Sequence, residues 1–252
     1  MTSTRLPGKV LLPIEGKPMI LQQIERLQRC QTLEQIVVAT SVDPSDDPLV
    51  EVLTEAGIEC VRGPLDDVLA RFVLVLKQYK ADVVVRLTGD CPLACPEIVD
   101  QVVDAFHASS ADYLSNTLLP TYPDGLDVEV LTSQTLLEIG DLSADPDEHE
   151  HVTLGIYRRP DRFRVANFVD PEGSDRSRLR WTVDNEGDFA FVSKIYSHFL
   201  PAKPNFDYAD IVHFLETNPH LSRTDSDSAR NAALTGKDTG VMKHPGNESS
   251  GE

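Results

Sequence analysis

The chain has 252 residues, 40% of them hydrophobic and 25% charged, an ordinary composition for a globular protein with a substantial core. Its formal net charge of −18 argues against nucleic acid as a partner, because a phosphate backbone would be repelled. No apolar run approaches the roughly 20 residues that span a bilayer, and the first residues lack the layout of a secretory signal. We therefore expect a cytoplasmic protein without a membrane partner, and we interpret its four scattered cysteines as reduced packing groups.

The first half of the sequence alternates between short apolar runs and amphipathic stretches. Runs typical of strands occur at 35–41, 58–63 and 81–90, and stretches typical of helices occur at 47–57, 66–80 and 96–109. This βαβ series predicts an α/β fold with a parallel sheet, covered by helices on both faces, through about residue 110. Ligands of such sheets bind at the carboxyl ends of the strands.

The pattern loosens in the second half. Strands are predicted at 112–116, 126–132, 162–168 and 179–184, with helices at 133–142, from about 148, and twice more before residue 217. From Asn218 onward the chain is polar and small-residue-rich, so it cannot bury enough surface to order itself. We therefore predict one domain over residues 1–217 and a disordered tail over residues 218–252.

The loop Arg5-Leu6-Pro7-Gly8-Lys9 carries two cations around a Pro-Gly turn. Gly8 lets the backbone approach a ligand closely, and Pro7 stiffens the turn. Arg5 and Lys9 together could grip the phosphates of a nucleotide. The alternative interpretation is a solvated N-terminal segment.

Two aspartates follow apolar runs at positions suited to a divalent cation. Asp90 lies in Thr88-Gly89-Asp90-Cys91-Pro92, at the end of the most apolar predicted strand, and Asp184 ends the predicted strand 179–184. Mg²⁺ is commonly bound by one or two carboxylates together with substrate phosphates. Asp90 could instead cap the next turn. We interpret Asp188 as structural, because it falls in the first turn of a predicted helix, where a negative charge is favourable.

Two further segments could contact a sugar. Asp127 and Glu129 alternate along a predicted strand and share one face, so they could accept hydrogen bonds from sugar hydroxyls or form a solvated edge. His149 and His151 are two residues apart and diverge on a helix, which argues against a zinc pair. His151 remains either a hydrogen-bonding ligand group or an ordinary helix residue.

Taken in order, several segments resemble the cytidylyltransferases that make CMP-sugars. They are STRLPGKVLLPIEGKPMI, IVVATS, DVVVRLTGDCPL, YPDGLDVEVL, EHVTLGIYRRPDRFRV and WTVDNEGDF. The resemblance covers roughly residues 2–217 and is stronger to the spore coat polysaccharide biosynthesis protein F group than to 3-deoxy-manno-octulosonate cytidylyltransferase. It implies a Rossmann-like mixed α/β sheet of the nucleotide-diphospho-sugar transferase type. It also implies a Mg²⁺-dependent reaction in which CTP and a sugar acid give a CMP-sugar and pyrophosphate.

The resemblance assigns expected roles to individual residues on the nucleotide side. Arg5 and Lys9 match the positions that hold the CTP phosphates and would stabilise the leaving pyrophosphate, with Gly8 in the loop between them. Lys17 matches a further basic position near that loop, and Arg71 falls in a segment that helps to form the nucleotide pocket.

The remaining expected roles concern the metal and the acceptor. Asp90 and Asp184 match the Mg²⁺ carboxylates, whereas Asp127, Glu129 and His151 fall in segments that line the acceptor sugar. Relatives commonly form dimers, so a homodimer is one arrangement that the resemblance allows.

The sequence departs from the family pattern at two places. Relatives usually carry a strand directly before the phosphate loop, so we expect that the first strand of the sheet is missing and that the natural chain starts upstream. Neighbouring strands would then have backbone groups without partners. In addition, His149 stands where the spore-coat group commonly has Arg, which bears on the choice of acceptor sugar.

Two other functions fit parts of the pattern. A glycosyltransferase of the same fold would usually show Asp-x-Asp at the metal strand, and TGDCP has a single Asp. A non-catalytic nucleotide-binding protein would account for the expected missing strand.

Overall fold

The computed structural model describes residues 5–224. Its α-helices are α1 (Met19–Leu27), α2 (Asp47–Glu55), α3 (Val68–Gln78), α4 (Pro96–Ala108), α5 (Ser133–Leu142), α6 (Pro146–Glu150), α7 (Leu154–Tyr157), α8 (Glu186–Phe199) and α9 (Tyr208–Thr217). Its strands are β1 (Pro13–Ile14), β2 (Lys17–Pro18), β3 (Val37–Ser41), β4 (Glu59–Gly63), β5 (Val83–Arg86), β6 (Tyr113–Ser115), β7 (Glu129–Thr132) and β8 (Val165–Asn167). Short 3₁₀ turns form η1 (Lys9–Leu11), η2 (Pro44–Asp46) and η3 (Pro219–Leu221).

Local side chains explain where most helices begin. Asp67, Thr132 and Asp145 each accept a hydrogen bond from a backbone N–H in the first turn of α3, α5 and α6. The α8 and α9 helices both begin with reciprocal capping boxes. The start positions of these helices are therefore encoded by nearby residues.

The strands form a mixed arrangement rather than one parallel sheet. The parallel pair β3–β4 is as expected, but β5 pairs antiparallel with β7, in the order β5-β7-β6-β8, with only β6 and β8 parallel in that sheet. The prediction of a parallel sheet through residue 110 is thus wrong for β5. The reason is that β7, from the second half of the chain, supplies the partner that β5 takes.

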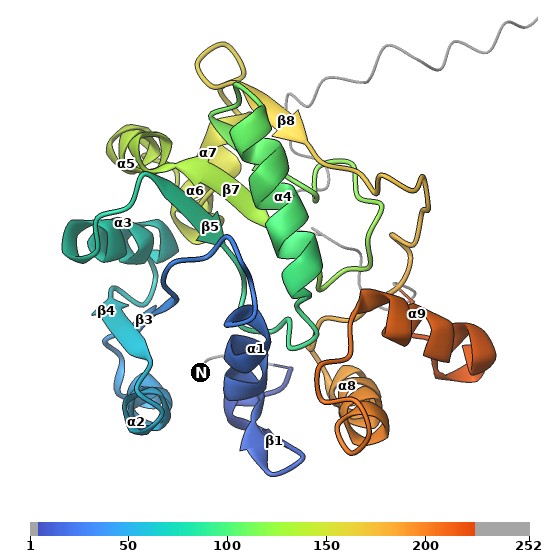
Figure 1. Ribbon diagram of the computed structural model, residues 1–252. Helices are drawn as coiled ribbons and strands as arrows, with labels where there is room; N and C mark the ends of the chain where they lie inside the picture. Colours follow the sequence, from blue (N-terminus) through green and yellow to red (C-terminus); the bar gives the residue numbers. More distant parts are fainter. Residues whose placement is uncertain (1–4, 225–252) are drawn as a thin grey trace, which may run out of the picture.

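Within residues 5–224, no strand joins β3 to β5. Both strands therefore have one edge without a ladder partner in the described structure, and Figure 1 shows the β3–β4 pair apart from β5 and β7. Side chains along β5 are half-buried rather than buried, as expected for a strand with one unpaired edge. The expectation that a first strand is missing stays a prediction.

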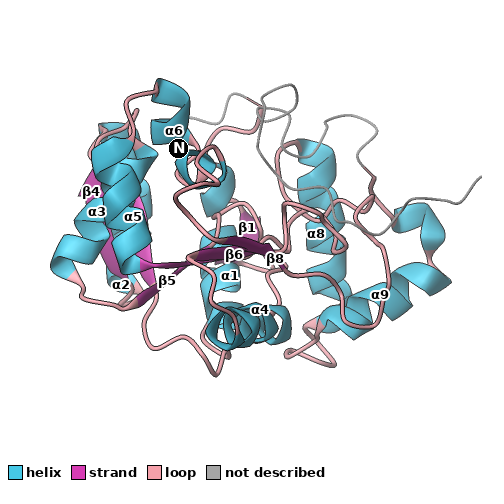
Figure 2. Cartoon of the chain, turned by 90° about the horizontal axis from the view of Figure 1, so that it is seen from above, coloured by secondary structure: helices cyan, strands magenta, loops and turns pink. Residues whose placement is uncertain are grey.

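The four-stranded sheet is covered on both faces. Alternating side chains divide between two apolar clusters: Leu114 and Val130 join α4 on one face, whereas Tyr113 and Leu131 join α3, α5 and α7 on the other. In the view of Figure 2, the sheet lies between α4 and α6, with α2 and α3 at one end of the molecule and α8 and α9 at the other. The predicted helix at 96–109 forms as α4, and its apolar side is buried, with five residues in the core: Ile98, Val99, Val102, Val103 and Phe106.

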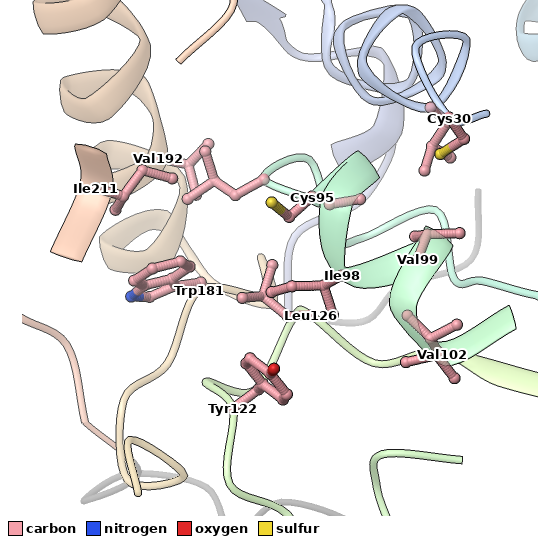
Figure 3. Close-up of a cluster of buried hydrophobic side chains, with 14 of the residues drawn as sticks. Cys30, Cys95, Ile98, Val99, Val102, Tyr122, Leu126, Trp181, Val192 and Ile211 are labelled. Atoms are coloured by element: carbon pink, nitrogen blue, oxygen red, sulfur yellow. The ribbon is translucent and has the colours of Figure 1, made fainter. Parts of the chain in front are cut away.

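The larger cluster ties the closing helices to the sheet. Trp181 is fully buried in it, and Figure 3 shows Trp181 and Leu126 between Ile98 of α4 and the side chains Val192 and Ile211 of α8 and α9. Among residues 5–224, none of the helices combines the length and apolar character that a membrane span requires.

The predicted strand at 179–184 does not form. This segment has only isolated bridges, from Arg180 to Asp124 and from Leu179 to Thr224, and its polar residues Arg180 and Thr182 are buried together with Trp181 and Val183. The first residues of the predicted tail, 218–224, are part of the described structure, and the carbonyl of Arg223 accepts a hydrogen bond from the Arg180 N–H at 2.9 Å. The rest of that tail, residues 225–252, lies outside the described residues.

A pH-dependent contact links α6 to the start of α3. Nδ1 of His149 lies 2.9 Å from Oδ2 of Asp67, and this contact raises the pKa of the imidazole above its ordinary value. A raised pKa in the folded state contributes stability that is complete below the unfolded pKa of about 6.5 and is lost as the pH rises through the folded value. We therefore expect the wild-type chain to lose more thermal stability than His149→Gln between about pH 5.5 and about pH 8.5. Melting temperatures measured across this range by circular dichroism check the expectation, and equal losses in the two proteins would contradict it.

Candidate active site

The loop at the start of the described chain is shaped by Gly8. Its φ of 67° lies in the left-handed region, which glycine adopts without a steric penalty. Gly8 caps η1, and the Lys9 N–H donates back to the Leu6 carbonyl at 3.2 Å. This tight turn fixes the position from which the Lys9 side chain projects.

The Lys9 ammonium lies between two carboxylates that are far apart in the sequence. Its Nζ is 2.9 Å from Oδ2 of Asp90 and 3.0 Å from Oδ1 of Asp184, and it donates to the Val183 carbonyl at 2.7 Å. Burial by itself lowers the pKa of Lys9, but the two carboxylates raise it by more, so the amine remains charged. The structure therefore brings three of the expected site residues to one point.

Asp184 has cations on both of its oxygens. Nη2 of Arg5 lies 3.1 Å from Oδ2, and Nη2 of Arg180 donates to the same oxygen, while Lys9 takes Oδ1. Burial raises the pKa of Asp184, but Lys9, Arg5 and Arg180 lower it by more, so the carboxylate is ionised at neutral pH. Arg5 is thus part of the cluster, although about half of its side chain remains exposed.

Arg180 also belongs to this cluster, although it was not predicted from the sequence. Its side chain is 5% exposed, and its Nη1 donates to Oδ2 of Asp124 at 2.8 Å while its Nε lies 3.4 Å from Oδ2 of Asp188. One guanidinium therefore bridges Asp124, Asp184 and Asp188. The only sign in the sequence was that Arg180 lies inside an apolar run. In the predicted strand 179–184, Arg180 would have been an ordinary outward-facing side chain.

Asp188 has the structural role that the sequence analysis gave it. It forms a capping box with Asn185 at the start of α8, and its side chain accepts the backbone N–H groups of Asp184 and Asn185. Asp188 also pairs with Arg223 at 3.0 Å. It therefore orients the backbone that carries Asp184.

Backbone contacts hold the two expected metal carboxylates next to each other. The Asp90 carbonyl accepts the Val183 N–H at 2.8 Å and the Thr182 hydroxyl at 3.2 Å. Gly125 also lies close to this segment: at its φ of 106°, an added Cβ would lie 2.5 Å from the backbone nitrogen of Thr182. The separation of the carboxylates is thus set by backbone packing.

The donor set fits a Mg²⁺ ion. One oxygen of Asp90 and one of Asp184 both lie within 3.0 Å of the same ammonium nitrogen, so both can reach one small cation. Mg²⁺ takes oxygen ligands at about 2.0–2.1 Å and usually keeps water or substrate phosphates among them. In the described part of the chain, no set of three or more His, Cys, Asp or Glu side chains is arranged to hold a metal ion. The other ligands would therefore have to come from substrate or water.

Glu129 lies in an internal network. Its Oε1 accepts the Tyr113 hydroxyl at 2.7 Å and the Thr153 hydroxyl at 2.5 Å, and Oε2 accepts a hydrogen bond from Nη1 of Arg86. Its side chain is 10% exposed. Burial lowers the pKa of Arg86, but Glu129 raises it by more, so the guanidinium stays charged. The structure thus gives the Glu129 carboxylate protein partners, whereas the sequence pattern suggested sugar hydroxyls or solvent.

The other expected acceptor residues are more accessible. Asp127 is half-buried two residues before β7 begins, close enough to Cys91 to help raise the pKa of that thiol, which burial raises most. His151 is half-buried at the C-terminal end of α6, where its carbonyl accepts the Leu154 N–H at 2.8 Å.

Two expected nucleotide residues lie apart from the carboxylate cluster. Lys17, in β2, pairs with Glu25 of α1. Arg71, in α3, lies against the end of β4, where a Cβ added to Gly63 would come within 2.9 Å of its Cγ. Its Nε is buried without a hydrogen-bond partner in the described structure, and burial lowers its pKa. This N–H group is already removed from water, so a hydrogen bond from it to a ligand would cost little further desolvation.

The fold and the cluster agree with a family comparison. A family model described as cytidylyltransferase matches residues 1–196. The chain belongs to the cytidylyltransferase family. This match includes the whole carboxylate cluster around Lys9, with Asp90 and Asp184, and the capping Asp188.

Individual relatives support this cytidylyltransferase assignment. The chain is 32% identical over 224 residues to the spore coat polysaccharide biosynthesis protein SpsF of Bacillus subtilis, covering 87% of this chain and 92% of that protein. The solved structure of a cytidylyltransferase from Leptospira borgpetersenii matches with a TM-score of 0.82 and 31% identity, over 88% of this chain and 92% of that chain. A structure of CMP:2-keto-3-deoxy-manno-octonic acid synthetase complexed with CTP matches at a TM-score of 0.59 and 18% identity, over 78% and 94% of the two chains. These likenesses confirm the expected nucleotide-diphospho-sugar transferase fold.

Proposed function

We propose that this cytidylyltransferase transfers CMP from CTP to a hydroxyl group of a sugar acid and releases pyrophosphate, in the synthesis of a surface polysaccharide or glycan. The observation that carries the proposal is the convergence of Lys9, Asp90 and Asp184 in a chain of this family. The names of two similar proteins, a spore coat polysaccharide biosynthesis protein and a synthetase complexed with CTP, support the choice of substrates.

The cations of the N-terminal loop would bind the triphosphate. Arg5 offers a planar fork for two phosphate oxygens, and Lys9 offers a mobile point charge. The left-handed turn at Gly8 would let the loop backbone lie close to a ligand held by these side chains. In this proposal Lys17 contributes a further positive charge, and Arg71 lines the nucleotide pocket with its unpaired Nε.

Asp90 and Asp184 would hold Mg²⁺ in this proposal. When bound, the ion would neutralise charge that develops on the phosphate oxygens. The chain's own residues hold these two carboxylates in position. Arg180 and Arg5 both contact Oδ2 of Asp184, and the Val183 N–H donates a hydrogen bond to the Asp90 carbonyl. Preorganised charges of this kind lower the barrier because they need no reorientation during the reaction.

The acceptor would bind beside β7. Asp127 and His151 are accessible enough to exchange hydrogen bonds with sugar hydroxyls. Glu129 would act mainly through its partners, since it holds Arg86, Tyr113 and Thr153 in one arrangement. We place the reaction in the cytoplasm, where thiols stay reduced, in keeping with the four cysteines, which are free.

A substrate matrix tests the proposal. CTP, ATP, GTP and UTP are each combined with a panel of sugar acids and Mg²⁺, and pyrophosphate release is followed by a coupled assay. We expect release with CTP and one class of sugar acid only. CTP binding in calorimetry without release in any combination would favour a non-catalytic nucleotide-binding protein. Transfer of a sugar from a nucleotide-sugar donor, without pyrophosphate, would favour a glycosyltransferase.

A further inference from the structure

Lys9 uses all of its hydrogen-bonding capacity on the protein. An ammonium group has three donors, and the three short contacts of Nζ go to Asp90, Asp184 and the Val183 carbonyl at 2.7–3.0 Å. Its side chain is 13% exposed. In this conformation no donor of Lys9 is left for a phosphate group.

The same ammonium occupies the point at which the two carboxylates converge. It contacts Oδ2 of Asp90 and Oδ1 of Asp184, so a divalent cation bridging these oxygens would need the space that Nζ fills. The two arginines do not compete for this space, because Arg5 and Arg180 both contact the other oxygen, Oδ2 of Asp184. Lys9 is therefore the group whose position a cation at this pair would take.

A lysine is well suited to leave such a position. Its charge sits on a flexible four-carbon stem, so the ammonium can move while the backbone of η1 stays in place. While it is in place, it offsets the repulsion between Asp90 and Asp184, which backbone bonds hold together. Without it, the two carboxylates would face each other with less compensation.

We propose that Lys9 is an internal place-holder for a divalent cation: it bridges Asp90 and Asp184 until the cation displaces it, and its ammonium then becomes available to the triphosphate. The inference rests on the proposed function for the identity of that second partner. Lys9 would then oppose metal binding in the metal-free protein and contact the nucleotide once the cation is bound.

Metal binding without nucleotide tests this role. Mn²⁺ is titrated into the full chain, and free Mn²⁺ is measured by electron paramagnetic resonance. We expect Lys9→Met to bind Mn²⁺ about tenfold more tightly than the wild-type chain, which corresponds to about 1.4 kcal/mol. Asp184→Asn in the Lys9→Met background should abolish this gain. The matched control is Lys203→Met, which removes an equal charge from a surface pair with Asp210 and should leave Mn²⁺ affinity unchanged.

A second measurement uses the wild-type chain and does not depend on the folding of a variant. An amine-acylating reagent is applied with and without Mg²⁺, and labelling of each lysine is measured by peptide mass spectrometry. Mg²⁺ should increase labelling of Lys9 several-fold and leave Lys203, already about half exposed, unchanged. Unchanged Lys9 labelling, or Mn²⁺ binding by Lys9→Met that is no tighter than wild type, would overturn the proposal.

Failure of the place-holder role and failure of CMP transfer give different results in these experiments. Pyrophosphate release by the wild-type chain with unchanged Mn²⁺ affinity in Lys9→Met would refute the place-holder and leave CMP transfer standing. Tighter Mn²⁺ binding by Lys9→Met, with no pyrophosphate release from any substrate pair, would refute CMP transfer and support the place-holder.

Discussion

The Asp90→Asn variant is expected to release pyrophosphate from CTP about a thousandfold more slowly than the wild-type chain. The substitution keeps the size of the side chain but removes one of the two carboxylates that converge beside the N-terminal loop. It also leaves the buried Lys9 ammonium with a single carboxylate partner, Asp184. The measurement is kcat at saturating CTP and sugar acid, with circular dichroism to show that the variant is folded.

The control for this variant is Asp112→Asn. Asp112 pairs with Arg164 at the protein surface, and such exposed pairs contribute about 1 kcal/mol or less. We expect its rate to stay within about twofold of the wild type. An Asp90→Asn rate as high as that of the control would remove Asp90 from the metal site and from the mechanism.

The Glu129→Gln variant is expected to lose about 3 kcal/mol of unfolding free energy. The substitution removes the negative charge that compensates the guanidinium of Arg86, whose side chain is 19% exposed. It also disturbs two hydrogen bonds, from Tyr113 and Thr153. Urea denaturation, followed by tryptophan fluorescence of the fully buried Trp181, measures the loss.

Two further variants show whether the loss comes from the unpaired charge. Arg86→Met combined with Glu129→Leu removes both charges, so it should be more stable than Glu129→Gln. Glu138→Gln breaks an exposed pair with Arg162 and should cost about 1 kcal/mol or less. A Glu129→Gln loss no larger than that of Glu138→Gln would mean that the network does not stabilise the fold.

Features encoded by neighbouring residues were predicted well from the sequence. The helix at 133–142 is α5 (Ser133–Leu142), because Thr132 caps it, and the structural role of Asp188 follows from its place three residues after Asn185. The apolar side of α4 was predictable for a similar reason, since helical spacing alone places its five residues together. Each of these features involves residues within one or two turns of each other.

Features that depend on distant partners were predicted less well. The predicted strand at 81–90 did form, as β5 (Val83–Arg86), but its partner is β7, from more than forty residues later. The segment 179–184 has the alternation of a strand, yet its backbone bonds go to single residues such as Asp124 and Arg223. Strand pairing depends on which other backbone lies alongside, and a single segment does not contain that information.

The candidate site divides in the same way. Asp90 and Asp184 were expected to share a cation because each ends an apolar run and because their segments resemble those of a known family, and the structure places both beside one ammonium. Nothing in the sequence indicated that this ammonium would be the Lys9 side chain lying between them. The burial of Arg180 against Asp124 and Asp188 was equally absent from the pattern.

The sequence by itself determined the family, the main helices and the residue types at the site, because these depend on short segments and their order. Only the tertiary structure decided which charges neutralise one another: Lys9 with Asp90 and Asp184, Arg180 with three aspartates, and Arg86 with Glu129. The physical reason is that buried charges are stable only when paired, and the pairs join residues that chain folding, rather than sequence proximity, brings within about 3 Å.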